Sequence, residues 1–188
     1  MESSKTVIGP RVPLVELEDD ERLGPGYEAS IEALGFIANL YKALGHRPEI
    51  VNTFVPFVAA AVGPTAKLHP NIRDLATLKA SKINGCPYCV GHRTWKGKMY
   101  GLSQEQIDAL DGDYAACELY DEKTKVGIAY AEALTLGPTH VTDELFEQVR
   151  EHFSTEEIVD LTMAVSLFNL LNRIGEGLKV PLEPQFLE

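Results

Sequence analysis

The sequence predicts an all-α protein with about seven or eight helices and no sheet. Apolar residues recur at helical spacing in one segment after another, and glycines, prolines and capping boxes separate these segments. No stretch alternates polar and apolar residues between hairpin signals, as a half-buried strand would. With 188 residues, 45% of them hydrophobic and 24% charged, the chain is suited to one globular domain with a real core.

The first 27 residues differ in composition from the rest of the chain. Prolines and glycines stand among acidic residues there, which favours an extended arm. We therefore divide the chain into an N-terminal arm, residues 1–27, and one helical domain, residues 28–188. The residues that interrupt the arm are Gly9, Pro10, Pro13, Gly24, Pro25 and Gly26.

Two helices are predicted at the start of the helical domain. Residues 28–44 form the first, because their apolar residues follow helical spacing and Gly45 provides a stop. Pro48 suits the first turn of the second helix, which runs to about residue 62 with a kink at Pro56. The spaced apolar residues of the first helix are Ile31, Leu34, Ile37, Ala38 and Tyr41.

Glycines delimit the next two predicted helices. One covers about residues 70–84 and is stopped by Gly85, and the other covers about residues 86–100 and is stopped by Gly101. The junction between them carries two of the three cysteines.

Side chains that cap helix N-termini begin the last four predicted helices. Ser103 with Gln106, and Ser154 with Glu157, have the spacing of capping boxes. Asp121 and Thr142 are single N-cap candidates. The predicted ranges are 103–110, 121–136, 142–153 and 154–178.

Net charge and hydropathy limit the classes of molecule that the protein can bind and the cellular compartment in which we expect it. A net charge of -11 repels DNA, RNA and acidic membrane surfaces, so we exclude them as main partners. The polar N-terminus lacks the apolar region of a signal peptide, and the longest apolar stretch, residues 53–63, is too short to span a bilayer. We expect a cytoplasmic protein whose three cysteines are kept reduced and form no disulfide scaffold.

Residues 84–93, Asn-Gly-Cys-Pro-Tyr-Cys-Val-Gly-His-Arg, carry the strongest chemical signal. Gly85 ends one helix and Pro87 suits the first position of the next, so Cys86 becomes the N-cap. Unpaired backbone N–H groups and the helix dipole then favour its thiolate, which lowers the pKa of Cys86 below about 8.5. Cys89 and His92 follow at intervals of one turn, an arrangement suited to dithiol–disulfide exchange.

A metal clip and plain packing are the alternatives to a redox pair. Structural zinc normally needs four ligands, yet Cys117 is the only other cysteine and the other histidines do not pair. A thioredoxin fold would need a βαβ pattern that is absent. We expect neither a metal nor a cofactor, since no glycine-rich phosphate loop is present. The scattered histidines are His46, His69, His140 and His152.

The stretch from Asp74 to His92, followed by Gly101-Leu-Ser-Gln-Glu-Gln-Ile, resembles the AhpD-like, or carboxymuconolactone decarboxylase, superfamily. The late segment Phe168-Asn-Leu-Leu-Asn-Arg-Ile is similar to the end helix of that family. The resemblance covers roughly residues 66–180. It implies an all-helical fold, assembly into trimers or hexamers, and alkylhydroperoxidase or disulfide-reductase activity carried by the cysteine pair.

The resemblance also implies a proton relay made of a carboxylate, a histidine and the cysteines. Here Asp74 stands where the family usually has glutamate, and His92 lies three residues after Cys89. The best-known members place the histidine one position later, where this chain has Arg93. We predict Asp74 and His92 as the relay.

Other residues receive weaker roles. Tyr88, Trp95 and Arg93 are candidates for the substrate pocket, although core packing for the aromatics and solvation for the arginine are the commoner cases. We expect Asn169, Asn172 and Arg173 to hold helices or subunits together, and Cys117 to be a packed thiol.

The predicted function is that of a dithiol peroxidase or disulfide reductase with an antioxidant role. One thiolate attacks a hydroperoxide, the other closes a disulfide, and a lipoyl or thioredoxin-like dithiol reduces it. The N-cap argument favours Cys86 as the thiolate, whereas the resemblance and His92 favour Cys89 for the peroxide, which is our choice. Two helices, residues 51–62 and 161–171, are apolar on more than one face, which favours a homo-oligomer.

Two other functions remain open. One is a cofactor-free lyase or isomerase acting on a small carboxylated lactone or β-keto acid, in which Asp74 and His92 move protons. The other is a redox-sensing or scaffold oligomer without turnover.

Overall fold

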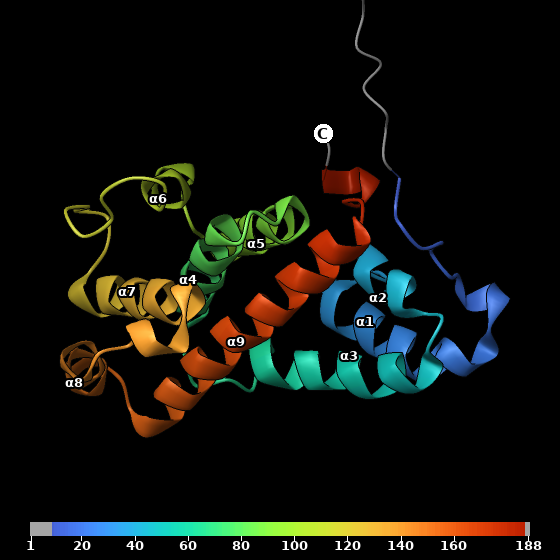
Figure 1. The fold of residues 1–188 in the computed structure, drawn as a ribbon, viewed down its shortest axis with the longest axis horizontal. Helices are drawn as coiled ribbons and strands as arrows, with labels where there is room; N and C mark the ends of the chain where they lie inside the picture. The colour runs from blue at the N-terminus through green and yellow to red at the C-terminus, as the bar shows by residue number, and fades with distance from the viewer. Residues whose placement is uncertain (1–8, 187–188) are drawn as a thin grey trace, which may run out of the picture. The chain divides into compact units, whose positions relative to one another are not determined.

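The computed structural model describes residues 9–186 and contains nine α-helices and no strand in that part of the chain (Figure 1). The all-α prediction is confirmed. Two 3-10 turns, Leu17–Asp19 and Glu21–Leu23, come before the first helix, and two more are Pro138–His140 and Pro184–Phe186. The helices are α1 (Gly24–Leu34), α2 (Asn39–Leu44), α3 (Pro48–Val62), α4 (Pro70–Ile83), α5 (Pro87–Met99), α6 (Gln104–Ala109), α7 (Glu122–Leu136), α8 (Asp143–His152) and α9 (Thr155–Leu178).

The predicted helix over residues 28–44 is wrong in its extent. The structure begins α1 at Gly24, inside the predicted arm, and interrupts the helix after Leu34. Gly35 adopts a left-handed conformation, with φ 85°, and its N–H bonds to the Ile31 carbonyl. Glycine takes this conformation without the steric cost of a side chain, so it ends the helix although the apolar spacing continues into α2.

The chain forms two compact units, and the first contains residues 9–59 and 174–186 of the described chain. Tyr27 is fully buried there and donates its hydroxyl to the Val15 carbonyl at 2.6 Å. The C-terminal segment is tied to the start of α2, because Glu183 Oε1 accepts the Asn39 N–H at 2.6 Å. The division of the chain into an arm and one helical domain stays a prediction.

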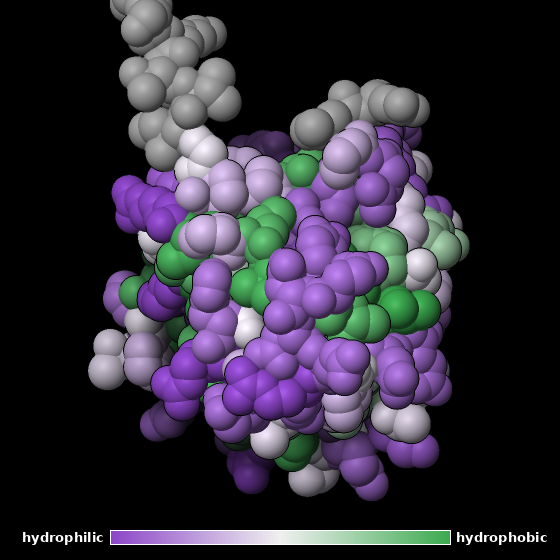
Figure 2. Space-filling model, turned by 90° about the vertical axis from the view of Figure 1, so that its right-hand side faces the viewer, coloured by the Kyte–Doolittle hydropathy of each residue, from purple (hydrophilic) through white to green (hydrophobic). Residues whose placement is uncertain are grey.

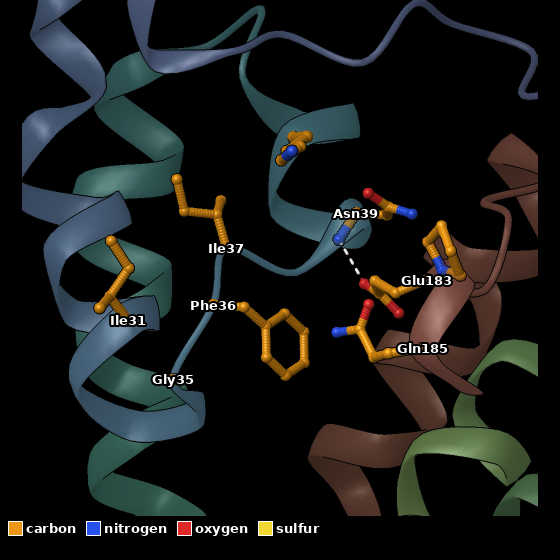
Figure 3. Close-up of a pocket in the computed structure, with 9 residues that line it drawn as sticks. Ile31, Gly35, Phe36, Ile37, Asn39, Glu183 and Gln185 are labelled. Carbon is orange, nitrogen blue, oxygen red and sulfur yellow. Dashed lines mark hydrogen bonds between the residues drawn. The ribbon is translucent and has the colours of Figure 1, made fainter.

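A hollow of about 370 Å³ opens among residues of this first unit (Figure 3). Ile31, Phe36 and Ile37 line one side and Gln185 the other. Its buried carboxylate, Glu183, is occupied in capping α2. On the face drawn in Figure 2, hydrophobic residues lie in small patches between hydrophilic ones.

The second unit, residues 60–173, is built around α4. Helices α5 and α7 both pack against α4, as the green and yellow ribbons of Figure 1 show. Ile72, Ala76 and Ala80 of α4 face one apolar cluster, whereas Leu75 and Leu78 face another. Because α4 is covered on several sides, even its polar residues Asp74, Thr77 and Ser81 are buried.

Helix α9 is, by length and composition, apolar enough to cross a membrane. The core helix of a soluble protein passes the same test, and 44% of the apolar window of α9 is buried inside the structure. Leu161 and Val165 are fully buried in the first apolar cluster of the second unit. The sequence estimate missed this helix because it considered only unbroken apolar stretches.

Candidate active site

The turn between α4 and α5 places the cysteine pair in the second unit. Gly85 follows α4 in a left-handed conformation, with φ 63°, which reverses the chain direction. The Cys86 N–H bonds to the Ser81 carbonyl at 3.1 Å and fixes the turn. Cys86 has extended dihedrals and precedes Pro87, so it is the N-cap of α5, as the sequence predicts.

The two sulfurs lie close together and are enclosed. Their Sγ atoms are 2.9 Å apart, within reach of an S–H···S hydrogen bond, and both thiols are free. The Cys89 N–H donates to the Cys86 Sγ at 3.3 Å, which satisfies one N–H that the helix start leaves unpaired. Cys86 is 0% exposed and Cys89 is 3% exposed. A small displacement of either sulfur would reach the bonding distance of about 2.05 Å.

The two cysteines differ in their tendency to ionise. The hydrogen bond to Cys86 raises the pKa of Cys89 far above its ordinary value, and burial and the negative charge of Cys86 act in the same direction. A hydrogen bond from Asn172 and the charge of Arg93 lower the pKa of Cys89 and offset part of this effect. The surroundings of Cys89 therefore favour its thiol form.

Asparagines of α9 connect the cysteine turn to the last helix. Asn84 Nδ2 donates to Asn169 Oδ1 at 3.0 Å and to Asn172 Oδ1 at 2.9 Å. Asn172 Nδ2 in turn donates to the Ser81 Oγ at 3.1 Å. The expected role of the asparagines in holding helices together is confirmed. Sequence reasoning missed that Asn172 also forms a hydrogen bond to Cys89. The Asn-x-x-Asn spacing, which resembles that of the family, was the feature that could have indicated this contact.

Asp74 lies in a buried cluster with two arginines. Its Oδ1 accepts from Arg93 Nη1 at 2.8 Å and lies 3.8 Å from Arg73 Nε. The aspartate side chain is 0% exposed and that of Arg93 is 10% exposed. Asp74 Oδ2 and the Nε atoms of both arginines are buried without a hydrogen-bond partner among the described residues. Asp74 thus bonds Arg93 rather than His92, and its predicted relay role stays a prediction.

The expectation of a solvated arginine at position 93 is wrong. Arg93 is buried between helices, and its guanidinium lies 4.4 Å from the ring centre of Phe168 on α9. Burial lowers the pKa of Arg93, whereas Asp74 raises it. An arginine remains charged in proteins, so a permanent cation lies within this core. Periodicity alone could not distinguish this buried position from an exposed one.

The aromatic candidates lie on α5 beside His92. Tyr88 is buried, and its ring centre is 4.5 Å from that of the half-buried His92. Trp95 is half-buried farther along the helix, with Lys96 Nζ 5.9 Å from its ring centre. Their place in a substrate pocket stays a prediction.

Cys117 lies apart from the pair in the chain segment between α6 and α7. It is partly buried and packs against the apolar cluster that contains Leu75 and Leu78, as expected for a packed thiol. Within residues 9–186, no group of three or more histidine, cysteine or acidic side chains is arranged to hold a metal ion.

Two comparisons establish the family. Residues 48–131 match the carboxymuconolactone decarboxylase family. The chain is also 31% identical over 111 residues to the uncharacterised protein YdfG of Bacillus subtilis, covering 58% of this chain and 75% of YdfG. The chain belongs to the carboxymuconolactone decarboxylase family. The matched range contains Asp74, both cysteines of the pair and Arg93.

Solved structures share the fold along most of the chain. The AhpD core of an uncharacterised peroxidase-related protein from Ralstonia eutropha has a TM-score of 0.81 at 22% identity, covering 94% of each chain. The debrominase Bmp8, in a complex with 2,3,4-tribromopyrrole and with one cysteine replaced by alanine, has a TM-score of 0.80 at 18% identity. That match covers 99% of this chain and 96% of Bmp8. Both place this member of the family in an all-helical, AhpD-like fold.

Proposed function

We propose that the protein is a cytoplasmic dithiol peroxidase or disulfide reductase that works through Cys86 and Cys89. The observation that carries this proposal is the 2.9 Å separation of the two sulfurs at the start of α5. Membership in the family suggests an enzyme, and the AhpD-like fold supports the same reading.

The first step uses the thiolate of Cys86. Its sulfur attacks the terminal oxygen of a hydroperoxide, so that an S–O bond forms and the O–O bond breaks. The alkoxide that leaves takes a proton from the Cys89 thiol and departs as an alcohol. Cys86 is thereby oxidised to a sulfenic acid, which keeps one oxygen of the peroxide.

The second step uses Cys89. Its thiolate attacks the Cys86 sulfur, so that the disulfide forms and hydroxide leaves to be protonated by solvent. An external dithiol, lipoyl or thioredoxin-like, then returns two electrons and two protons to the pair. This order reverses our initial choice of Cys89 for the peroxide, because Cys86 accepts the backbone N–H and the surroundings of Cys89 raise its pKa.

A thiol count tests the reaction. The reduced chain has three thiols, and one equivalent of tert-butyl hydroperoxide should leave one without adding mass. A Cys117→Ser control should lose both remaining thiols in the same way. In Cys89→Ser, the sulfenic acid should persist on Cys86 and be trapped by a sulfenic-acid reagent. Loss of no thiol at all would rule out the redox reaction.

Reductive dehalogenation is a second candidate, favoured by the likeness of the fold to Bmp8. A thiolate would take bromine from an electron-rich aromatic carbon, which would then acquire a proton. The second thiolate would displace bromide and form the same disulfide. Release of one bromide per disulfide from a bromopyrrole, without turnover of hydroperoxides, would favour this activity.

The lyase or isomerase alternative depends on proton transfer rather than on sulfur. Asp74 is engaged with Arg93, which leaves that alternative without further support. Turnover of a carboxylated lactone by Cys86→Ser would nevertheless establish it, since the cysteines would then be dispensable.

We also propose that the protein forms a homo-oligomer, a trimer or hexamer. Val159, Met163 and Leu170 are exposed on α9 at spacings of four and seven residues, which places them on one face. An apolar face of this kind is suited to a subunit contact. A stable monomer in size-exclusion chromatography at micromolar concentration would contradict this assembly. With a net charge of -11, neither nucleic acid nor an acidic membrane is proposed as a partner.

A further inference from the structure

We propose that Arg93, held in place by Asp74, is a fixed cation that favours the thiolate of Cys89 and takes the place of an acid–imidazole proton relay. This inference rests on the proposed dithiol chemistry and adds to it a positioning role for two residues. The cation would stabilise the charge that Cys89 must acquire before it closes the disulfide, and it would do so without transferring a proton.

The geometry fixes the guanidinium from two sides. Arg93 follows Cys89 by four residues on α5, so the two side chains lie on the same face of the helix. Its Nη1 donates to Asp74 Oδ1 at 2.8 Å, and its Cζ lies 4.4 Å from the Phe168 ring centre. An arginine held by an ion pair and an aromatic ring has little freedom to leave this position.

The buried cluster carries an excess of positive charge. Two guanidinium groups, Arg73 and Arg93, share one carboxylate, Asp74, and all three side chains are buried. The exposed Tyr100 ring lies 5.9 Å from Arg73 and adds no formal charge. A net positive charge in a poorly solvated region favours a nearby thiolate over a thiol. In agreement with this, the charge of Arg93 lowers the pKa of Cys89.

Helices α5 and α9 carry the other side chains that are compared with Arg93. Helix α5 contributes Tyr88 and His92, whose rings lie against each other. Helix α9 contributes the neutral side chains of Asn172 and Phe168. His92 is therefore the group with which Arg93 must be compared, because an imidazole could also favour the thiolate.

A variant with one thiol separates these roles. Cys86→Ser together with Cys117→Ser leaves Cys89 as the only cysteine, and ultraviolet thiolate absorbance then reports the pKa of Cys89 without any peroxidase assay. In this background, Arg93→Gln should raise the pKa of Cys89 by at least about one unit. Asp74→Asn should lower it by about one unit, because it removes the negative charge that offsets the guanidinium. His92→Gln should change it by only about a few tenths of a unit.

The sign of the Asp74→Asn effect decides between a cation and a relay. A relay needs the carboxylate, so a rise in the pKa of Cys89 in Asp74→Asn would overturn the proposal. A shift in His92→Gln as large as that in Arg93→Gln would overturn it as well.

A neutral pair protects the test against a folding defect. If Arg93→Gln alone does not fold, the double variant Asp74→Asn, Arg93→Gln replaces the ion pair with two amides. The two opposite effects should then cancel, so the pKa of Cys89 should stay within about a few tenths of a unit of its value in the parent background, and a rise of about one unit in the folded double variant would overturn the proposal. If Arg93→Gln raises the pKa of Cys89 but the parent protein reduces no hydroperoxide, the electrostatic role of Arg93 is upheld and only the proposed peroxidase reaction is refuted.

Discussion

The three cysteines of this chain lie in two regions that differ in local structure and in the polar groups around the sulfurs. Cys86 and Cys89 begin a helix, where one sulfur accepts a backbone N–H, and Arg93 and Asn172 act on the other. Cys117 lies between helices and packs against an apolar cluster. The difference teaches that a helix start and nearby polar groups, rather than burial itself, prepare a thiol for chemistry.

The largest expected effect separates the two regions directly. Cys86→Ser should reduce dithiol-dependent peroxide turnover at least about a thousandfold, because the nucleophile is lost. Cys117→Ser should retain the parental rate, since its sulfur belongs to the apolar packing. Steady-state reduction of tert-butyl hydroperoxide by a dithiol measures both. Equal losses in the two variants would abolish the distinction between the regions.

The second effect concerns the buried charges of Asp74 and Arg93, which distinguish the region of the cysteine pair from that of Cys117. Arg93→Ala leaves the Asp74 carboxylate buried without its main partner, which should lower the free energy of unfolding by about 3–5 kcal/mol. The exposed pair of Glu147 and Arg150 provides a matched control. Glu147→Ala should cost less than about 1 kcal/mol in the same urea titration. A loss in Arg93→Ala no greater than in this control would show that the buried pair contributes little.

The start of a helix was predictable from the sequence wherever a capping side chain next to it determines that start. Ser103, Asp121, Thr142 and Ser154 cap helices in the structure as the sequence predicts. The break at Gly35 was not predictable from periodicity, because the apolar spacing runs through it. The left-handed conformation of Gly35 is a property of the backbone dihedrals, which the spacing of apolar side chains does not report. The position of Cys86 as N-cap also followed from neighbouring residues alone.

The surroundings of the cysteine pair could not be read from the sequence in the same way. Successive residues of a helix point about 100° apart, so the packing of α4 against α5 decides whether His92 or Arg93 faces Asp74. The contact of Asn172 with Cys89 likewise depends on where α9 lies beside α5. Resemblance to the family favoured the histidine, whereas the structure places the arginine beside the carboxylate.

The third effect is a pH dependence of stability that only the pair should cause. The folded state raises the pKa of Cys89, so its stabilising contribution is complete below the unfolded pKa of about 8.5 and is lost as pH rises above it. Between about pH 8.5 and 9.5, before tyrosines titrate near 10, the free energy of unfolding should fall by up to about 1.4 kcal/mol per unit. Urea titrations of the reduced protein measure this slope.

The matched variants locate the source of that slope. Cys89→Ser should lack it, whereas Cys117→Ser should retain it. Above about pH 10 the slope loses this meaning, because burial also raises the pKa of Tyr27, Tyr114 and Tyr120. A slope that persists in Cys89→Ser would assign the pH dependence to another group.

The smallest effect concerns Cys117 itself. Cys117→Ser places a hydroxyl against a partly buried apolar cluster, which should lower the free energy of unfolding by about 0.5–1 kcal/mol. Cys117→Ala, which adds no polar group, should cost no more than the serine variant. Thermal unfolding of the two variants measures the difference, and a much larger loss in either would give this lone thiol a structural importance that its packing does not indicate.

The enclosure of the two sulfurs, 0% and 3% exposed, has a consequence for the supply of electrons. A thioredoxin-like domain is broad and could bring its own sulfur to theirs only if the residues that cover them moved aside. A lipoyl group on a long, slender arm needs only a narrow entrance. We therefore expect the width of the reductant to decide its rate of reaction with this protein. A lipoyl dithiol on a long arm should react faster than a globular thioredoxin-like protein of equal reduction potential.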